Sequence, residues 1–229
     1  MVVCDGSLIT LEKRNGPPRS LAGREGRSLV LMEAPVVIVG MDSVEVDRRL
    51  SSGELECPCG GRLAPWGHAR QRLVRDVGVL RPRRARCGSC WVTHVLLAVS
   101  CVLRRADGVD VIGEALRWKV AGAGHRPIAA RLARPVSTVR GWLRAFTANA
   151  EVVRALCTDL LVRLDPLTAA APSHPTRFAD AVDAVGVCAA AARRRLGVVG
   201  AVSPWQLASA LTSGLLLAAS LRGKSINTS

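Results

Sequence analysis

The sequences Cys57-Pro58-Cys59-Gly60-Gly61 and Cys87-Gly88-Ser89-Cys90 decide the fold of the first half of the chain. The residues between them are typical of a hairpin, which would bring the four thiolates together. Four thiolates in a tetrahedron bind zinc, and the metal replaces the core that a small β unit cannot build. Because the protein supplies all four ligands, such a site is structural rather than catalytic. We therefore predict a zinc ribbon over residues 35–103, with the metal ligands Cys57, Cys59, Cys87 and Cys90.

The first cysteine pair is one residue shorter than the second. A C-x-C pair can chelate a metal, but its bite is more strained than that of C-x-x-C, so we expect weaker zinc binding or recruitment of His68 or His94 as a replacement ligand. The alternative is that these cysteines are ordinary buried residues or the remnant of a decayed site.

Short β elements and one helix are predicted around the cysteines. The apolar run 36–39 predicts a strand, and Asp42-Ser43 predicts the start of a helix that ends near Leu50. Two extended runs within residues 72–86, placed around Asp76-Val77-Gly78, predict the hairpin, and a third apolar run covers residues 92–102. Residues 1–34 show no sustained periodicity, so we expect a flexible leader, with Met32 or Met41 as alternative starts.

Residues 104–147 predict a helix-turn-helix unit. Asp107 is a candidate cap for a helix through Val120, a short helix follows over residues 128–133, and Ser137 is a candidate cap for a helix that ends at Phe146. In this arrangement the last helix would lie in the major groove of DNA. The apolar positions that would pack between the helices are Ile128, Ala129, Leu132, Val139, Trp142 and Leu143.

The outer face of this unit supplies candidate DNA contacts. Ser137 and Thr138 stand at a helix start, where side-chain hydroxyls and backbone N–H groups can bind phosphate. Arg140 is the best candidate for a bidentate contact to guanine, with Arg144 one turn further along. The candidate contacts to the DNA backbone are Arg126, Arg131 and Arg134 here, and Arg83 and Arg84 in the hairpin.

Charge is concentrated in this part of the chain. The 229 residues include 32 Lys and Arg and 18 Asp and Glu, for a net charge of +14. Residues 57–146 hold 17 basic and 4 acidic residues, a net of +13. The codon bias of a GC-rich gene would spread arginine evenly, so this concentration favours binding to a polyanion. A solvated basic face is the alternative.

The C-terminal region, residues 148–229, is predicted to be helical. Apolar spacing predicts a helix from about Val153 to Leu164, a linker over residues 165–175, and a helix from Phe178 to Leu196. The segment 196–221 has no charged residue and is long enough to span a bilayer, but its polar residues and the N-cap pattern Ser203-Pro204 favour a buried or partner-binding helix. The expected fold class is therefore mostly α, with a small β zinc ribbon, a helix-turn-helix three-helix unit and an α-helical C-terminal region.

Several segments support a resemblance to a known family. They are Gly67-His68-Ala69-Arg70, Arg75-Asp76, residues 81–87, Thr93-His94-Val95-Leu96-Leu97, Arg104-Arg105-Ala106-Asp107 and residues 124–146. Together they resemble a family of actinobacterial helix-turn-helix proteins with an N-terminal zinc ribbon, and they are more distantly similar to the zinc-ribbon heads of insertion-sequence transposases. The family usually has two residues inside its first cysteine pair, where this chain has one. The resemblance implies DNA binding in the context of mobile elements, without an established activity.

We do not expect an enzyme. A complete transposase needs a carboxylate triad on an RNase H-like domain, whereas the five acids after Phe146 lie in a helical, alanine-rich pattern. The leading hypothesis is a cytoplasmic, sequence-specific reader of double-stranded DNA, either a regulator or an accessory factor, with no small-molecule substrate. Its C-terminal helices would form a homodimer or bind a recombinase. The alternatives are a non-catalytic interaction module or stranded transposase head, and an RNA-binding protein, for which five Trp and two Phe are a small supply of stacking residues.

Overall fold

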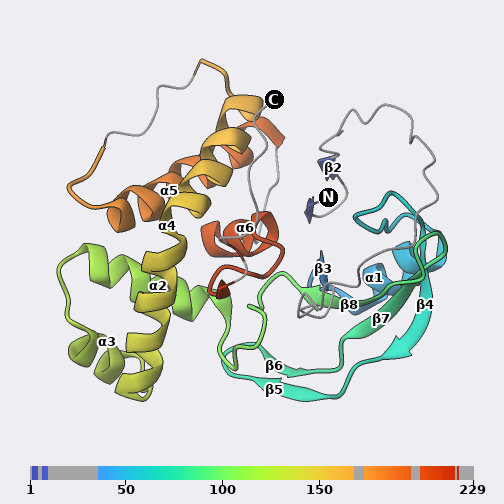
Figure 1. Ribbon diagram of the computed structural model, residues 1–229, viewed down its shortest axis with the longest axis horizontal. Coiled ribbons are helices and arrows are strands. Elements are labelled where there is room, and N and C mark those ends of the chain that lie inside the picture. The colour runs from blue at the N-terminus through green and yellow to red at the C-terminus, as the bar shows by residue number, and fades with distance from the viewer. Residues whose placement is uncertain are drawn as a thin grey trace, which may run out of the picture.

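The protein combines a sheet half and a helical half in one mixed α/β structure (Figure 1). The computed structural model describes residues 36–167, 173–196, 202–219 and 221, together with the backbone of residues 2–4 and 7–9. The expected mostly α fold is therefore right only in part. The second half of the chain is helical, but the first half is built around strands.

A four-stranded sheet forms the centre of the first half. Its strands are β3 (Val36–Val39), β8 (Thr93–Ala98), β7 (Arg83–Cys87) and β4 (Leu63–His68), in that spatial order. β3 runs parallel to β8, and the other two pairs are antiparallel. The predicted strand 36–39 is confirmed, whereas the strand β4 was not predicted. In the expected flexible leader the described backbone forms a small antiparallel pair, β1 (Val2–Cys4) and β2 (Ser7–Ile9).

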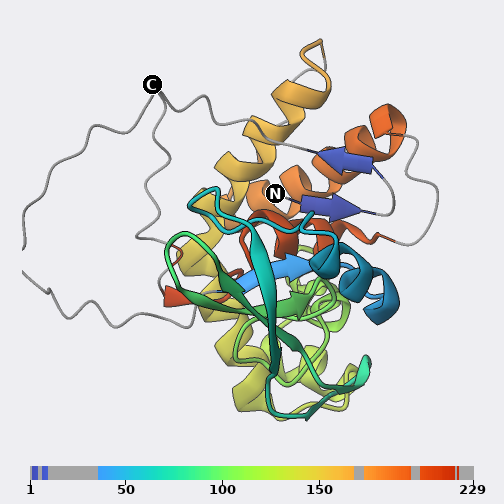
Figure 2. The same ribbon diagram turned by 90° about the vertical axis from the view of Figure 1, so that its right-hand side faces the viewer.

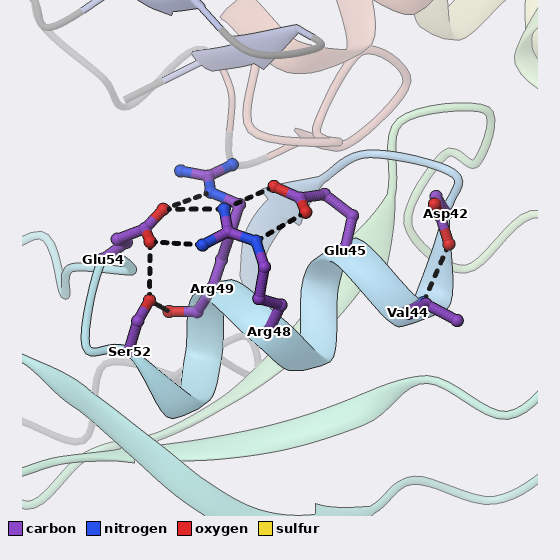
Figure 3. Close-up of polar contacts among 7 residues, drawn as sticks. All are labelled: Asp42, Val44, Glu45, Arg48, Arg49, Ser52 and Glu54. Carbon is purple, nitrogen blue, oxygen red and sulfur yellow. Dashed lines mark hydrogen bonds and ion pairs between the residues drawn. The ribbon is translucent and has the colours of Figure 1, made fainter.

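Helix α1 (Ser43–Ser51) covers one face of the sheet, where Val46 and Leu50 pack against Leu63 and Leu96. The predicted cap is confirmed, because Asp42 accepts a hydrogen bond from the Val44 backbone N–H. At the other end of the helix, Glu54 accepts hydrogen bonds from Arg48, Arg49 and Ser52 (Figure 3). These bonds fix the chain just before Cys57.

A long β arm, formed by strands within residues 63–87, connects the two halves. Beyond β4 and β7 it continues as the hairpin of β5 (Arg72–Val74) and β6 (Gly78–Leu80). The turn predicted around Asp76 is present, but the second predicted run, residues 80–86, lies mostly in β7 and pairs with β4 and β8 rather than with β5. The tip of the arm is fixed to the loop before the first long helix, because the Arg75 N–H donates to the Ala106 carbonyl and the Gly108 N–H donates to the Arg75 carbonyl. Figure 2 shows the sheet half in front of the helices.

Three helices follow in the region where a helix-turn-helix unit is expected: α2 (Val109–Val120), α3 (His125–Arg131) and α4 (Val136–Leu164). Two predicted caps are wrong. Gly108 rather than Asp107 precedes α2, and Pro135 rather than Ser137 precedes α4. The Asp107 carboxylate instead binds two arginines, and that pairing outweighs a local cap.

Helix α4 is longer than the sequence suggested. We expected separate helices, one ending at Phe146 and another from about Val153 to Leu164, but the structure has a single helix over residues 136–164. The intervening residues include neither Pro nor Gly, so nothing local interrupts the backbone hydrogen bonds. The expected domain boundary at residue 147 therefore falls inside a continuous helix.

The C-terminal region packs back onto both halves. Helix α5 (Arg177–Leu196) lies along α4, and the short helix α6 (Pro204–Leu211) lies between the α4–α5 pair and the sheet (Figure 1). Asn149 donates to the carbonyls of Leu216 and Ala218, and the Leu103 N–H donates to the Gly214 carbonyl.

The uncharged segment 196–221 contains helix α6 and the cap predicted for it. The predicted cap Ser203 is confirmed, because its hydroxyl accepts a hydrogen bond from the Gln206 N–H. Residues 197–201 of the uncharged segment, and residues 168–172 of the expected linker, lie outside the described part of the chain. Among the described helices, none has the length and hydropathy needed to cross a bilayer.

Candidate metal centre and candidate nucleic-acid interface

The four predicted cysteines meet at one point of the sheet half. The Sγ atoms of Cys57, Cys59, Cys87 and Cys90 all lie within 4.8 Å of one another. The Cys57 and Cys90 sulfurs are 3.6 Å apart, and the Cys59 and Cys87 sulfurs are 3.5 Å apart. Zinc–sulfur bonds of about 2.3 Å in a tetrahedron place the sulfurs roughly 3.8 Å apart. The donor set and its spacing therefore fit a single metal ion.

The short first pair reaches the cluster because the backbone turns sharply after it. The Gly60 N–H donates to the Cys57 carbonyl, and the Cys57 N–H donates to the Gly61 carbonyl. Gly60 adopts φ 83°, a conformation that glycine enters readily. Gly61 lies against the second pair, where an added Cβ would be 2.6 Å from Cys87 Sγ and 2.5 Å from Ser89 Oγ. Gly61 was not among the predicted site residues, although the pair Gly60-Gly61 after Cys59 is a sequence signal for a tight turn.

Backbone amides favour a thiolate at the second pair. The N–H groups of Cys90 and Ser89 point at the Cys87 sulfur from 3.5 and 3.3 Å and lower the pKa of this thiol to about 6. Burial raises the pKa of the Cys57 thiol to about 12. Because a metal binds thiolates, an ion at this point would supply the positive charge that a buried sulfur otherwise lacks.

The two histidines considered as replacement ligands lie in different places. His94 on β8 is buried, and its Nε2 atom is 3.2 Å from Cys57 Sγ. His68 at the end of β4 is exposed and faces the Arg83 guanidinium. His94 is therefore placed to orient Cys57 from outside the group of four sulfurs, in the way that neighbouring groups orient metal ligands.

A second candidate site covers the outer side of α2, α3 and the first turns of α4. Residues 115–150 include seven basic residues and not one acid: Arg117, Lys119, Arg126, Arg131, Arg134, Arg140 and Arg144. The predicted inner face of this unit is buried at Ile128, Ala129, Val139, Trp142 and Leu143, with Leu132 half-buried. These helices are therefore held together by an apolar core. All of these basic residues except Arg134 are exposed, and Arg117 is paired with Glu114.

The candidate contacts at the start of α4 lie on the outer surface. Ser137, Arg140 and Arg144 are exposed, and Thr138 is half-buried. No side chain caps the first turn of α4, and the Thr138 and Val139 N–H groups donate to the Pro135 carbonyl. The preceding N–H groups of Val136 and Ser137 are the ones placed to bind an anion. The structure thus brings hydroxyls, two guanidinium groups and an uncapped helix end onto one surface.

The arginines predicted to contact the DNA backbone differ in their surroundings. Arg126 is exposed, and the Arg131 guanidinium lies 5.2 Å from the centre of the Trp118 ring. Arg134 is only 12% exposed and forms ion pairs with Asp76 and Asp107. Two carboxylates of the same chain therefore already neutralise the positive charge of Arg134.

The hairpin arginines differ in the same way. Arg83 Nε is 2.6 Å from Asp47 Oδ1 on α1, whereas Arg84 is exposed on the opposite face of β7. Of the two, Arg84 therefore has the guanidinium that is accessible to a phosphate group.

Comparisons of this chain with protein-family models, with curated proteins and with solved structures find no match.

Proposed function

We propose that this chain binds double-stranded DNA in a sequence-specific way through the first turns of α4, and that a structural zinc ion stabilises its cysteine-bearing half. The observation that carries the proposal is the group of exposed arginines Arg126, Arg131, Arg140 and Arg144, set on an apolar three-helix core in a segment, residues 115–150, that contains no acid. A basic surface of this kind attracts phosphates, and a helix presented by a short turn fits the major groove.

Each exposed residue has a role in this proposal. Arg140 reads a guanine edge with two hydrogen bonds, Arg144 extends the contact by one turn, and Ser137 and Thr138 bind the adjacent phosphate. Arg126 and Arg131 contact the DNA backbone on the side of α3. Arg134 is assigned a positioning role, because its ion pairs with Asp76 and Asp107 fix the turn before α4.

Zinc is the metal that best suits the four-cysteine site. A closed set of four thiolates is the usual ligand set of a structural zinc ion and has no open position for a substrate. When bound, the ion would cross-link the loop after α1 to the turn after β7. The resemblance to actinobacterial helix-turn-helix proteins supports a role as a regulator or as an accessory factor of a mobile element.

The test separates base reading from phosphate binding. Purified protein is incubated with a pool of randomised DNA duplexes at physiological salt, and the bound fraction is sequenced. We expect the wild-type protein to enrich a common site. Arg140→Ala should lose preference at one or two positions, whereas Arg126→Ala should weaken binding to all sequences alike and lower the salt slope by about one.

The same experiment can contradict the proposal. Uniform recovery of all sequences by the wild-type protein would show that the surface binds DNA through its charge alone and does not read the base sequence. If both variants lose the same affinity for all sequences, Arg140 does not recognise a base. Circular dichroism and metal content of each variant, measured in parallel, show whether a loss reflects misfolding.

A further inference from the structure

Two tryptophans form an exposed surface beside the cysteine cluster. Trp66 is 53% exposed and Trp91 is 65% exposed. Arg86 belongs to the same surface, with its Cζ atom 4.6 Å from the centre of the Trp66 ring and 4.9 Å from that of the Trp91 ring. We call these three residues the Trp–Arg–Trp surface. Exposed neighbouring tryptophans are uncommon and mark contact sites more often than they serve the fold.

The backbone holds both tryptophans outward. The pairing of β4 with β7 shifts register between Pro65 and His68, and this irregularity includes Trp66. Trp91 has φ 62°, a left-handed conformation that a bulky residue rarely adopts. Its N–H donates to the Cys87 carbonyl, and its carbonyl accepts from Arg86 Nε. Conformations of this kind persist where surrounding contacts enforce them, and they gather at functional sites.

The sheet leaves this surface uncovered. Arg86 pairs across β7 with Ala64 on one side and with Thr93 on the other, and both neighbours have short side chains. The alternate β7 residues Ala85 and Cys87 are fully buried under α1 on the opposite face. The indole rings therefore lie on the open face of the sheet, with the guanidinium beside each ring.

The surrounding charge indicates the occupant. Residues 57–91 contain eight arginines and a single acid, Asp76. Asp76 pairs with Arg134 at the tip of the arm. Among the described residues, no ion pair involves the exposed side chains of Arg62, Arg70, Arg81 or Arg84. A partner with a regular series of negative charges and flat, stackable groups fits this combination better than a protein surface does.

We propose that the Trp–Arg–Trp surface binds single-stranded nucleic acid, with unpaired bases stacking on Trp66 and Trp91 and with phosphates on the neighbouring arginines. Both faces of a base inside a duplex are covered by its neighbours, so an indole can stack only on an unpaired base. The surface lies apart from α4: Figure 1 shows β4 and β7 at one end of the molecule and α2 and α3 at the other. This inference does not depend on duplex reading by α4.

The first experiment measures fluorescence anisotropy of a labelled single-stranded 12-mer of mixed sequence. Its comparison strand is an abasic 12-mer that has the same phosphates and no bases. We expect the wild-type protein to bind the base-bearing strand at least several-fold more tightly. The double variant Trp66→Ala/Trp91→Ala should bind it about 5- to 100-fold more weakly, as expected for the loss of stacked bases. Equal wild-type affinity for the two strands overturns the proposal.

Matched variants separate stacking from folding and from charge. Trp66→Phe/Trp91→Phe keeps two stacking rings and should retain most of the affinity. Leu73→Ala/Val79→Ala removes the exposed cross-strand pair of β5 and β6, and should leave strand binding unchanged. DNA and RNA versions of the same strand show which sugar is preferred. If the alanine and phenylalanine variants bind like the wild type, the surface does not stack bases.

Two further outcomes distinguish this inference from the other possibilities. Trp66→Ala/Trp91→Ala should keep the duplex preference of the wild-type protein, so a loss of strand binding with intact duplex specificity concerns the Trp–Arg–Trp surface alone. If Trp66→Ala/Trp91→Ala keeps its strand affinity but loses self-association in sedimentation velocity, the surface is a protein interface and the proposal is wrong.

Discussion

Asp107 Oδ1 accepts a hydrogen bond from Arg134 Nε at 2.6 Å, and this contact joins the start of α2 to the turn between α3 and α4. The other carboxylate oxygen of Asp107 accepts from Arg75 at the tip of the arm. Arg134 in turn pairs with Asp76, also at that tip. Four charged residues therefore lock the sheet half to the helices that carry the proposed DNA surface.

Loss of the Asp107 charge should destabilise the protein strongly. Its side chain is 2% exposed, and Asp107→Asn would leave the largely buried Arg134 with only one of its two carboxylate partners, Asp76. We expect the free energy of unfolding to fall by about 2–3 kcal/mol, measured by urea denaturation. The control is Asp159→Asn, which breaks an exposed pair with Arg163 and should cost less than about 0.5 kcal/mol. Equal decreases in the free energy of unfolding in both variants would show that the buried Asp107 pair contributes no more to stability than the exposed Asp159 pair.

A methyl group at Gly61 should abolish metal binding without removing any ligand. An added Cβ would overlap Cys87 Sγ and Ser89 Oγ, so Gly61→Ala should separate the two cysteine pairs. Plasma mass spectrometry of the purified wild-type protein should find about one zinc ion per chain, and Gly61→Ala and Cys87→Ser should both lose it. In Gly88→Ala the nearest atom to the added Cβ is 3.9 Å away, so this variant should keep its metal. A fully folded, metal-free wild-type protein would refute the zinc assignment.

Local sequence patterns predicted those elements whose ends depend on local residues. Asp42 caps the start of α1, Ser203 caps the start of α6, and the turn at Asp76-Val77 joins the two strands of the β5–β6 hairpin. The clustering of the four cysteines could also be predicted from their spacing, including the short first pair. In each case the residues that determine the structure are close in sequence, so tertiary contacts did not need to be known.

Several features that local patterns did not reveal depend on partners that are distant in sequence. Asp107 looked like a helix cap, but Arg75 and Arg134 bind its carboxylate. Arg134, which was predicted to contact the DNA backbone, forms ion pairs with Asp76 and Asp107, and both carboxylates come from distant parts of the sequence. The parallel pairing of β3 with β8 joins segments separated by the whole arm, and no local pattern encodes it. Trp66 and Trp91 likewise become neighbours only when β4 pairs with β7.

Acid should weaken the polar network at the end of α1. Hydrogen bonds from Arg48 and Ser52 lower the pKa of Glu54 from 4.5 to about 2. A carboxyl group whose pKa is lower in the folded state stabilises that state above its unfolded pKa, and the contribution is lost as pH falls through the folded pKa. The difference in unfolding free energy between wild type and Glu54→Gln should thus be constant above about pH 5 and shrink toward about pH 2. This difference cancels contributions that both proteins share, such as metal loss in acid, and high salt should reduce it. A difference that is independent of pH would contradict the assignment.

Replacing glycine by alanine at two helix positions, Gly113 and Gly186, should have opposite effects on stability, because only Gly113 lies against the Trp205 ring. On α2, an added Cβ at Gly113 would lie 2.1 Å from Cγ and Cδ1 of the buried Trp205 ring, and a rigid ring cannot yield that much. Gly113→Ala should therefore displace α6 and lower the free energy of unfolding by about 2–3 kcal/mol or more. On α5, Gly186 has no atom within 4 Å of an added Cβ, so Gly186→Ala should raise stability by about 0.5–1 kcal/mol through the better helix propensity of alanine. Urea denaturation of both variants measures the two effects, and quenching of tryptophan fluorescence by iodide reports whether Trp205 becomes accessible in Gly113→Ala. If Gly113→Ala is as stable as Gly186→Ala, α6 does not pack on α2 in solution as it does in this structure.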